Sequence, residues 1–227
     1  GCTGGLPWTG IGWYRREFSA PAGKKVYLVF DGAMSNATVY VNGKQVGSWP
    51  NGYVAMRLDV TDAVVPGESN ILAVRLENEP QSSRWYPGAG LYRNVHLVTT
   101  DELHFKGWGP FFTTPEVSAS KAKVSVQAEL EGFARQNAIC RTAILDKDGF
   151  TVASVESPVK AASFSQELII DNPNLWSPKS PYLYKAVTQI YVDGRMTDEY
   201  AHAIGIRKIE FIDGVGFLLN GELTKFK

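Results

Sequence analysis

Two neighbouring carboxylates offer the first candidate chemistry in this sequence of 227 residues. Glu77 and Glu79 flank Asn78, and Pro80 follows directly. Two carboxyl groups about 5–5.5 Å apart, on opposite sides of a glycosidic bond, can cleave that bond through a covalent intermediate. Carboxylates that share one exposed strand end are poorly placed to straddle a substrate in this way. We therefore interpret the segment as a solvated strand end that Pro80 terminates.

Two segments that combine aromatic and polar residues suit binding chemistry better. Residues 8–14 include Thr9 between tryptophans, and residues 81–90 include Ser83 and Arg84 beside a third tryptophan. Flat aromatic faces stack on sugar rings, and an arginine fork adds planar hydrogen bonding. We interpret both segments as loops, and contact with sugar is one hypothesis for them. The alternative is that their tryptophans are core residues of a β-sandwich.

Ligands for a metal ion are sparse in the sequence. Residues 146–149 resemble the start of a calcium loop, but Ser157 stands where the twelfth-position Glu is required, so we predict a hairpin turn. Two cysteines cannot build a disulfide framework or a zinc site, and Cys140 is expected to be a small buried hydrophobe. The histidines are predicted to be strand residues and not metal ligands: His96, His104 and His202.

The composition excludes several classes of function. The 23 Lys and Arg residues balance 23 Asp and Glu residues, and 44% of the chain is hydrophobic, which excludes intrinsic disorder. Without a basic run, the chain lacks the clustered charge that binding to nucleic acid or to an anionic membrane requires. No apolar run approaches the roughly 18 residues needed to span a bilayer. A folded protein without nucleic-acid or membrane partners is expected.

Short apolar segments, separated by turn residues every 8–12 positions, predict an all-β fold. Residues 26–30 read as a strand buried on both faces, and residues 70–77 alternate between apolar and polar side chains. Asn42-Gly43 lies between two such segments and is a strong signal for a type I′ hairpin. No stretch shows the helical spacing of apolar residues, so no helix is predicted.

A second series of strands begins after residues 98–101. Residues 123–130 alternate cleanly, and residues 193–195 mark a further hairpin. We predict two tandem β-sandwiches, residues 1–98 and 99–208, with residues 209–227 starting a third unit. The chain opens without Met and stops within an element, so it is expected to be a piece of a longer protein.

Many short motifs in one order carry a resemblance to a known family. They are Gly12-Trp13-Tyr14-Arg15-Arg16-Glu17-Phe18, Phe30-Asp31-Gly32-Ala33, Tyr40-Val41-Asn42-Gly43, Ser83-Arg84-Trp85-Tyr86-Pro87-Gly88-Ala89-Gly90, Leu175-Trp176-Ser177-Pro178 and Gly216-Phe217-Leu218-Leu219-Asn220-Gly221. In these motifs and their order, the sequence resembles family 2 glycoside hydrolases. Within the family it is most similar to the bacterial β-galactosidases, and the match covers almost the whole chain.

The resemblance implies that successive parts of the chain form different domains. Residues 1–98 would be a jelly-roll, sugar-binding-like domain that lacks its first strands, and residues 99–208 an immunoglobulin-like sandwich. The catalytic (β/α)8 barrel would begin near residue 209, with both catalytic glutamates beyond Lys227, so this chain should be inactive by itself. No cofactor is expected in this chain, whereas the parent enzyme would bind Mg²⁺ or another divalent cation in its barrel.

The resemblance also implies where the first domain meets substrate. In related β-galactosidases an Asn and an Asp from loops of this domain reach the active site. Thr9 and Ser83 occupy those positions here and depart from the expected residue types, which makes Arg84 the substitute candidate. The parent would hydrolyse terminal β-galactosides and form a homo-oligomer. A periplasmic or extracellular bacterial location is expected over a cytoplasmic one.

Other functions fit the same sequence. β-Glucuronidases and β-mannosidases share this front-end architecture, so the sugar is open. A freestanding carbohydrate-binding module would bind sugar without a barrel and would lose that affinity on Arg84→Ala. A structural adhesion sandwich would bind no sugar and would present an interface to its own copies.

Overall fold

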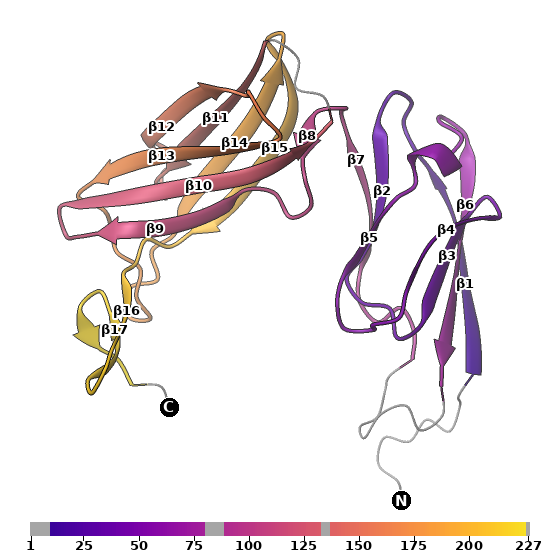
Figure 1. Ribbon diagram of the computed structural model, residues 1–227, viewed down its shortest axis with the longest axis horizontal. Helices are drawn as coiled ribbons and strands as arrows, with labels where there is room; N and C mark the ends of the chain where they lie inside the picture. Colours follow the sequence, from indigo (N-terminus) through magenta and orange to yellow (C-terminus); the bar gives the residue numbers. More distant parts are fainter. Residues whose placement is uncertain (1–9, 80–88, 133–136, 226–227) are drawn as a thin grey trace, which may run out of the picture. The chain divides into compact units, whose positions relative to one another are not determined.

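The computed structural model of the protein describes residues 10–79, 89–132 and 137–225. These residues form eighteen β-strands and one 3₁₀ turn, and the described part of the chain has no α-helix. None of its helical segments is long and apolar enough to cross a membrane. The chain divides into two compact units, Gly1–Asp101 and Glu102–Lys227, and each is built from sheets packed face to face (Figure 1). The predicted all-β fold of tandem sandwiches is confirmed.

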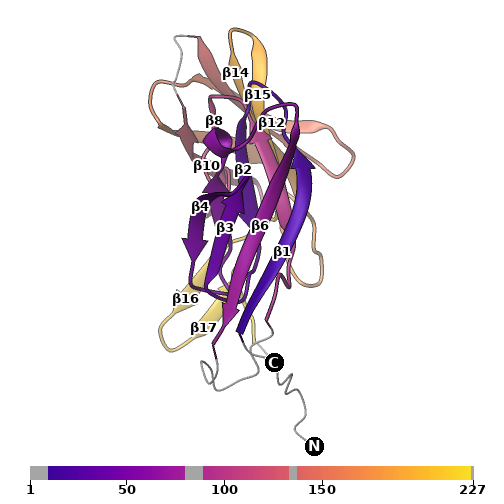
Figure 2. The same cartoon turned by 90° about the vertical axis from the view of Figure 1, so that its right-hand side faces the viewer.

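The first unit consists of two antiparallel sheets. The larger has the order β1–β6–β3–β4 and is seen face-on in Figure 2. Its strands are β1 (Gly10–Ser19), β6 (Ser69–Asn78), β3 (Ala37–Val41) and β4 (Lys44–Trp49). The smaller sheet has the order β5 (Met56–Asp59), β2 (Lys25–Phe30) and β7 (Val95–Thr100), and the 3₁₀ turn is η1 (Thr61–Ala63). Strands β1 and β7 are therefore edge strands.

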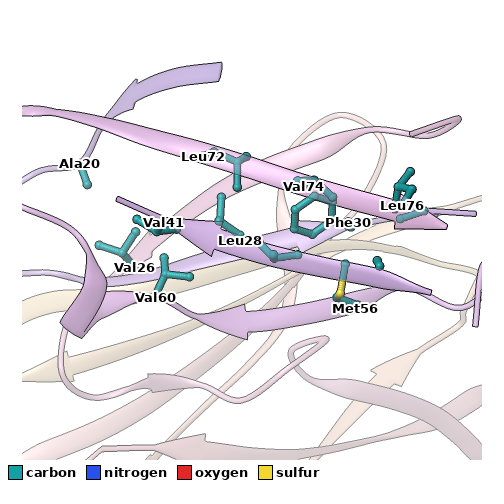
Figure 3. Packing of buried hydrophobic residues seen from close by; sticks show 13 residues of the cluster. Ala20, Val26, Leu28, Phe30, Val41, Met56, Val60, Leu72, Val74 and Leu76 are labelled. Atoms are coloured by element: carbon teal, nitrogen blue, oxygen red, sulfur yellow. The ribbon is translucent and has the colours of Figure 1, made fainter. Parts of the chain in front are cut away.

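One apolar cluster fills the space between these two sheets. Alternation along β6 sends Leu72, Val74 and Leu76 inward, where each is at most 8% exposed. They meet side chains of β2, and Figure 3 shows Leu28 and Phe30 pointing toward them. Burying each large side chain contributes about 1.5–3 kcal/mol. The predicted strand at residues 26–30 is confirmed, since all five of its residues are buried.

The β3–β4 hairpin follows from its turn residues. Asn42 and Gly43 have φ values of 51° and 81°, the left-handed pair that a type I′ turn needs. The Asn42 side chain also donates to Asn70 Oδ1 at 2.7 Å, while its Oδ1 accepts from the Ile71 backbone N–H at 2.9 Å. The turn is thereby tied to the start of β6.

Strand β1 departs from the loop predicted over residues 8–14. Residues 10–14 form the start of this ten-residue strand, in antiparallel register with the whole of β6. The strand escaped prediction because an edge strand that is exposed on both faces shows little alternation of apolar and polar residues. Trp13 is 60% exposed, so its interpretation as a core residue is wrong.

The second unit is also a sandwich of antiparallel sheets. In one sheet β10 (Lys121–Glu131) pairs with β13 (Ser163–Asp171), β8 (His104–Phe105) and β9 (Phe111–Val117). The other has the order β12 (Thr151–Pro158), β11 (Ala138–Leu145), β14 (Tyr184–Val192) and β15 (Arg195–Ile204). Residues 146–149 join β11 to β12, which confirms the predicted hairpin turn.

A polar layer crosses the core of the second unit. Three buried residues lie between its two apolar clusters: Thr142 on β11, Gln166 on β13 and Thr188 on β14. The Thr142 hydroxyl donates to Gln166 Oε1 at 2.6 Å and lies 3.3 Å from the Thr188 hydroxyl. The Gln166 amide donates to the Cys140 carbonyl at 2.9 Å and to Ser157 Oγ at 2.8 Å. The layer therefore joins the two sheets.

A small third sheet follows the second sandwich. It comprises β16 (Ile209–Ile212), β17 (Gly216–Leu219) and β18 (Glu222–Leu223). Asn220, in the turn between β17 and β18, donates to the Trp176 carbonyl at 3.1 Å and accepts from the Lys208 backbone N–H at 2.9 Å. Trp176 in turn donates its backbone N–H to Ile206. These bonds tie the small sheet to the sandwich before it.

Candidate functional site

The predicted sugar-contacting residues come from segments whose attachment points are neighbours. Thr9, Ser83 and Arg84 lie outside the residues that the structure describes. Thr9 directly precedes Gly10, the first residue of β1, and residues 80–88 follow soon after Asn78, the last residue of β6. Gly10 and Asn78 are direct partners in the sheet. Both segments therefore start from one end of the first unit.

Gly90, the last residue of the second segment, lies at the same end of the first unit. Gly90 and Met34 exchange backbone hydrogen bonds of 2.9 and 3.0 Å. Gly90 has φ 124°, and a Cβ there would lie 2.7 Å from the Tyr14 hydroxyl, so only glycine allows this approach to β1. Tyr92 donates its hydroxyl to the Gly52 carbonyl at 2.8 Å. These contacts hold residues 90–92 against Met34 and Gly52.

A short turn after Met34 braces the end of β6. The Ser35 hydroxyl donates to the Glu77 carbonyl at 2.8 Å, and the Ser35 carbonyl accepts from the Glu77 backbone N–H at 2.9 Å. Asn36, in the left-handed region at φ 45°, lies 3.4 Å from Glu79 Oε1 through its amide nitrogen. The turn thus places hydroxyl, amide and carboxylate groups beside the base of both candidate segments.

The two carboxylates of this end have different polar partners. Glu77 Oε2 is 2.8 Å from Arg75 Nη2, which neutralises it on the outer face of β6. Strand β6 ends at Asn78, which confirms the predicted strand end. Asn78 is nevertheless buried, at 6% exposure, and not solvated as predicted. Its Oδ1 is buried without a hydrogen-bond partner in the described structure, an acceptor at the base of the loops.

An aromatic surface lies on the outer face of the larger sheet of this unit. The Trp13 and Tyr40 rings are 5.8 Å apart at an angle of 35°. Arg75 is the direct partner of Trp13 across β1 and β6. The sequence pointed to Trp13 as an aromatic with binding potential, and its exposure agrees with that interpretation. The position of Tyr40 beside Trp13 could have been predicted only from the register of β3 against β6.

The histidines are strand residues, as predicted. His96 lies on β7, His104 on β8 and His202 on β15. His96 Nε2 is 3.0 Å from Asp31 Oδ2, and the buried His104 Nε2 is 3.2 Å from Glu131 Oε2. Across residues 10–79, 89–132 and 137–225, no three His, Cys, Asp or Glu side chains gather as a metal site would require.

Family profiles match both units. The profile described as glycosyl hydrolase 2 galactose-binding domain-like matches residues 7–89, and the profile of glycosyl hydrolases family 2 matches residues 109–207. The chain belongs to glycosyl hydrolase family 2. The resemblance drawn from the sequence motifs is thereby confirmed, and the end of the first unit that anchors residues 80–88 belongs to the galactose-binding-like domain.

Family 2 relatives match nearly the whole chain. Beta-galactosidase BoGH2A of Bacteroides ovatus is 38% identical over 98% of this chain and 27% of its own length. A beta-glucuronidase of Formosa agariphila is 32% identical over 96% of this chain and 25% of its own length. The crystal structure of a family 2 member from Bacteroides cellulosilyticus has a TM-score of 0.90 at 40% identity, over 96% of this chain and 29% of that one. The chain spans about a quarter of each relative's length.

Proposed function

We propose that the two units are the non-catalytic front end of a longer retaining glycosidase that hydrolyses terminal β-galactosides in carbohydrate catabolism. The observation that carries this proposal is the similarity to Beta-galactosidase BoGH2A, which extends over 98% of this chain but only 27% of that enzyme. In the proposed division, residues 1–98 and 99–208 are accessory sandwiches and residues 209–227 begin the catalytic barrel. Both catalytic glutamates, and any divalent cation, would belong to that barrel.

The proposed role of the first unit is to supply contacts at the rim of the active-site pocket. Thr9, Ser83 and Arg84 would make them, from the end of the unit where Gly10 pairs with Asn78. An arginine fork and hydroxyls suit the hydroxyls of a terminal sugar. We further propose a carbohydrate substrate as the partner, a homo-oligomeric parent, and a periplasmic or extracellular location.

A β-glucuronidase front end is the second candidate. The Formosa agariphila beta-glucuronidase at 32% identity favours it, as does a further relative from that organism, also named as a β-glucuronidase, at 38% identity. The structure of Bacteroides uniformis beta-glucuronidase matches with a TM-score of 0.84 at 29% identity. An anionic sugar would pair directly with Arg84, whereas a galactoside would only accept hydrogen bonds from it.

Activity of the full-length product of the gene that encodes this chain separates the two candidates. We expect turnover of a chromogenic β-galactoside well above that of the matching β-glucuronide, and none by the 227-residue chain alone. A preference for the glucuronide would replace the first proposal with the second. Turnover by a clean preparation of the chain alone would contradict the front-end assignment itself.

Substitutions at the rim test the role of the first unit. In the full-length protein, Arg84→Ala should raise KM for the preferred substrate about tenfold, the effect of one charge-assisted hydrogen bond, with a smaller effect on kcat. Arg141→Ala is the matched control, because Arg141 is an exposed arginine that pairs with Glu156 in the second unit. Equal effects of both substitutions would show that Arg84 acts only through stability. Freestanding sugar affinity of the chain, lost on Arg84→Ala, would favour a binding module.

A further inference from the structure

The turn between β8 and β9 of the second unit can be followed in Figure 1. It carries an exposed tryptophan. Trp108 is 70% exposed and lies between Gly107 and Gly109, which have φ values of 60° and 79°. A Cβ at Gly109 would lie 2.5 Å from the Tyr200 ring, and the Tyr200 hydroxyl donates to the Gly107 carbonyl at 3.3 Å. The turn therefore packs on β15 and holds Trp108 outward.

This tryptophan borders a cleft of about 700 Å³. Phe111, 65% exposed, lines the same cleft as Trp108. Large aromatic side chains exposed along one cleft are costly in water, and exposed apolar patches mark binding sites. The same cleft is also lined by residues with hydrogen-bonding side chains: Gln127, Ser163 and Ser165.

The charged groups of the cleft compensate each other. Among the described residues, its charged lining residues are Lys106 and Glu129, whose Nζ and Oε2 atoms are 2.8 Å apart. This pairing lowers the pKa of Glu129 and raises that of Lys106, through a hydrogen bond and charge attraction. Both groups stay charged at neutral pH, so the cleft presents no net charge to a ligand.

We propose that this cleft binds a neutral oligosaccharide, with Trp108 and Phe111 stacking on sugar rings and Gln127, Ser163 and Ser165 bonding to hydroxyls. A pyranose has an apolar C–H face and a rim of hydroxyls, and the cleft offers a partner to each. The balanced Lys106–Glu129 pair favours neutral sugars over uronates or phosphates. The site lies on the second unit and does not depend on the pocket-rim role proposed for the first.

Titration of the isotope-labelled 227-residue chain with neutral oligosaccharides tests the site. The probes are β-1,4-galactotetraose and cellotetraose, and the readout is the indole N–H resonance that disappears in Trp108→Ala. We expect that resonance to shift on titration, and Trp108→Ala to weaken binding about tenfold or more. Trp108→Phe should recover part of the affinity, which excludes simple misfolding as the cause of the loss.

Two further variants separate sugar binding from other events. Phe150→Ala is the matched control, because Phe150 is 71% exposed in a turn outside the cleft, and it should leave binding unchanged. Gln127→Leu keeps the apolar area but removes an amide, so it should weaken sugar binding several-fold. The proposal fails if neither probe moves the Trp108 resonance, or if tetragalacturonate binds as tightly. It also fails if Trp108→Ala abolishes only self-association measured by sedimentation, since a second copy would then be the occupant.

Discussion

In the first unit the buried asparagines stand at the two ends of β6, whereas in the second unit three buried polar residues, Thr142, Gln166 and Thr188, cross the middle of the core. Asn70, fully buried, accepts from the Val65 backbone N–H at 2.7 Å and donates to the Val65 and Glu68 carbonyls at 3.0 Å. Asn78, at the opposite end of the strand, leaves its Oδ1 without a partner in the described structure. At the end of β6 away from the candidate loops, the buried asparagine thus has hydrogen-bond partners for both its oxygen and its nitrogen.

This difference affects how each sandwich fixes the alignment of its two sheets. In the first unit the core cluster is apolar, and the buried Asn70 bonds to Val65 and Glu68 at its edge. In the second unit a slip of two residues along β13 would place Leu168 or Phe164 where Gln166 now meets Thr142. That slip would leave buried hydrogen-bonding groups unpaired, each at a cost of about 1–3 kcal/mol. The polar layer therefore specifies one alignment of the sheets.

The largest expected effects come from truncating one large core side chain in each unit. Phe30 and Phe105 are both at most 1% exposed, one in each unit. We expect Phe30→Ala to destabilise the first unit by about 3–5 kcal/mol, and Phe105→Ala to destabilise the second by a similar amount, because each leaves a cavity. Hydrogen exchange followed residue by residue should show each loss confined to its own unit. Loss spreading equally to both would mean that the units unfold as one.

The polar layer should respond differently to single and combined substitutions. Gln166→Leu leaves the Thr142 hydroxyl and the Cys140 carbonyl without their amide partner, and should cost about 2–3 kcal/mol. The combined Thr142→Val, Gln166→Leu, Thr188→Val chain replaces the layer with apolar groups, and should be more stable than the single variant. Denaturant midpoints measure both. A triple variant with a lower denaturant midpoint than Gln166→Leu would contradict the role that we assign to the polar layer in the second core.

The two ends of β6 can be compared directly. Asn70→Ala removes bonds to three backbone groups and should cost about 2 kcal/mol, in the range of several net hydrogen bonds. Asn78→Ala should cost less stability, since its Oδ1 makes no bond in the described structure. Thermal unfolding of both variants supplies the measurement. Asn78→Ala could instead destabilise the protein more than Asn70→Ala does. Asn78 would then have a structural role, and its unpaired Oδ1 would need no functional explanation.

Much of the fold follows from local signals in the sequence. Alternation along residues 123–130 predicts the inward face of β10, where Val124 and Val126 are fully buried. Asn42-Gly43 predicts a hairpin because few other residues accept two left-handed conformations in succession. These signals depend on neighbours in the chain, which a sequence displays directly.

What the sequence could not show depends on distant partners. Nothing local distinguishes Thr142 or Gln166 from polar residues that point to solvent, because their partners are supplied by other strands. Trp108 offered only a motif, and its cleft forms where the β8–β9 turn meets β10 and β13. The candidate residues Thr9, Ser83 and Arg84 stay predictions, resting on the family resemblance and on their paired attachment points.

The smallest expected effect concerns the thiol beside the polar layer. Burial raises the pKa of Cys140 from 9.0 to about 12, against a partly offsetting hydrogen bond with Thr142. The native state thus keeps its proton over a range in which the unfolded state loses it. The contribution of this thiol to stability is therefore constant well below pH 9 and falls by about 1.4 kcal/mol per pH unit between roughly pH 9 and pH 12, since unfolding then releases a proton.

Replacing the thiol isolates its contribution from that of other groups that titrate in alkali. In a Cys2→Ser background, the free energy of unfolding of the second unit should drop between pH 9 and pH 10 by about 1 kcal/mol more than in the matching Cys140→Val variant. An alkylating reagent at pH 8 should also modify native Cys140 about a thousandfold more slowly than the denatured chain, because so little thiolate is present. Rapid native alkylation would show that the core beside the polar layer opens readily, which would contradict the conclusion that the layer holds the sheets in one alignment.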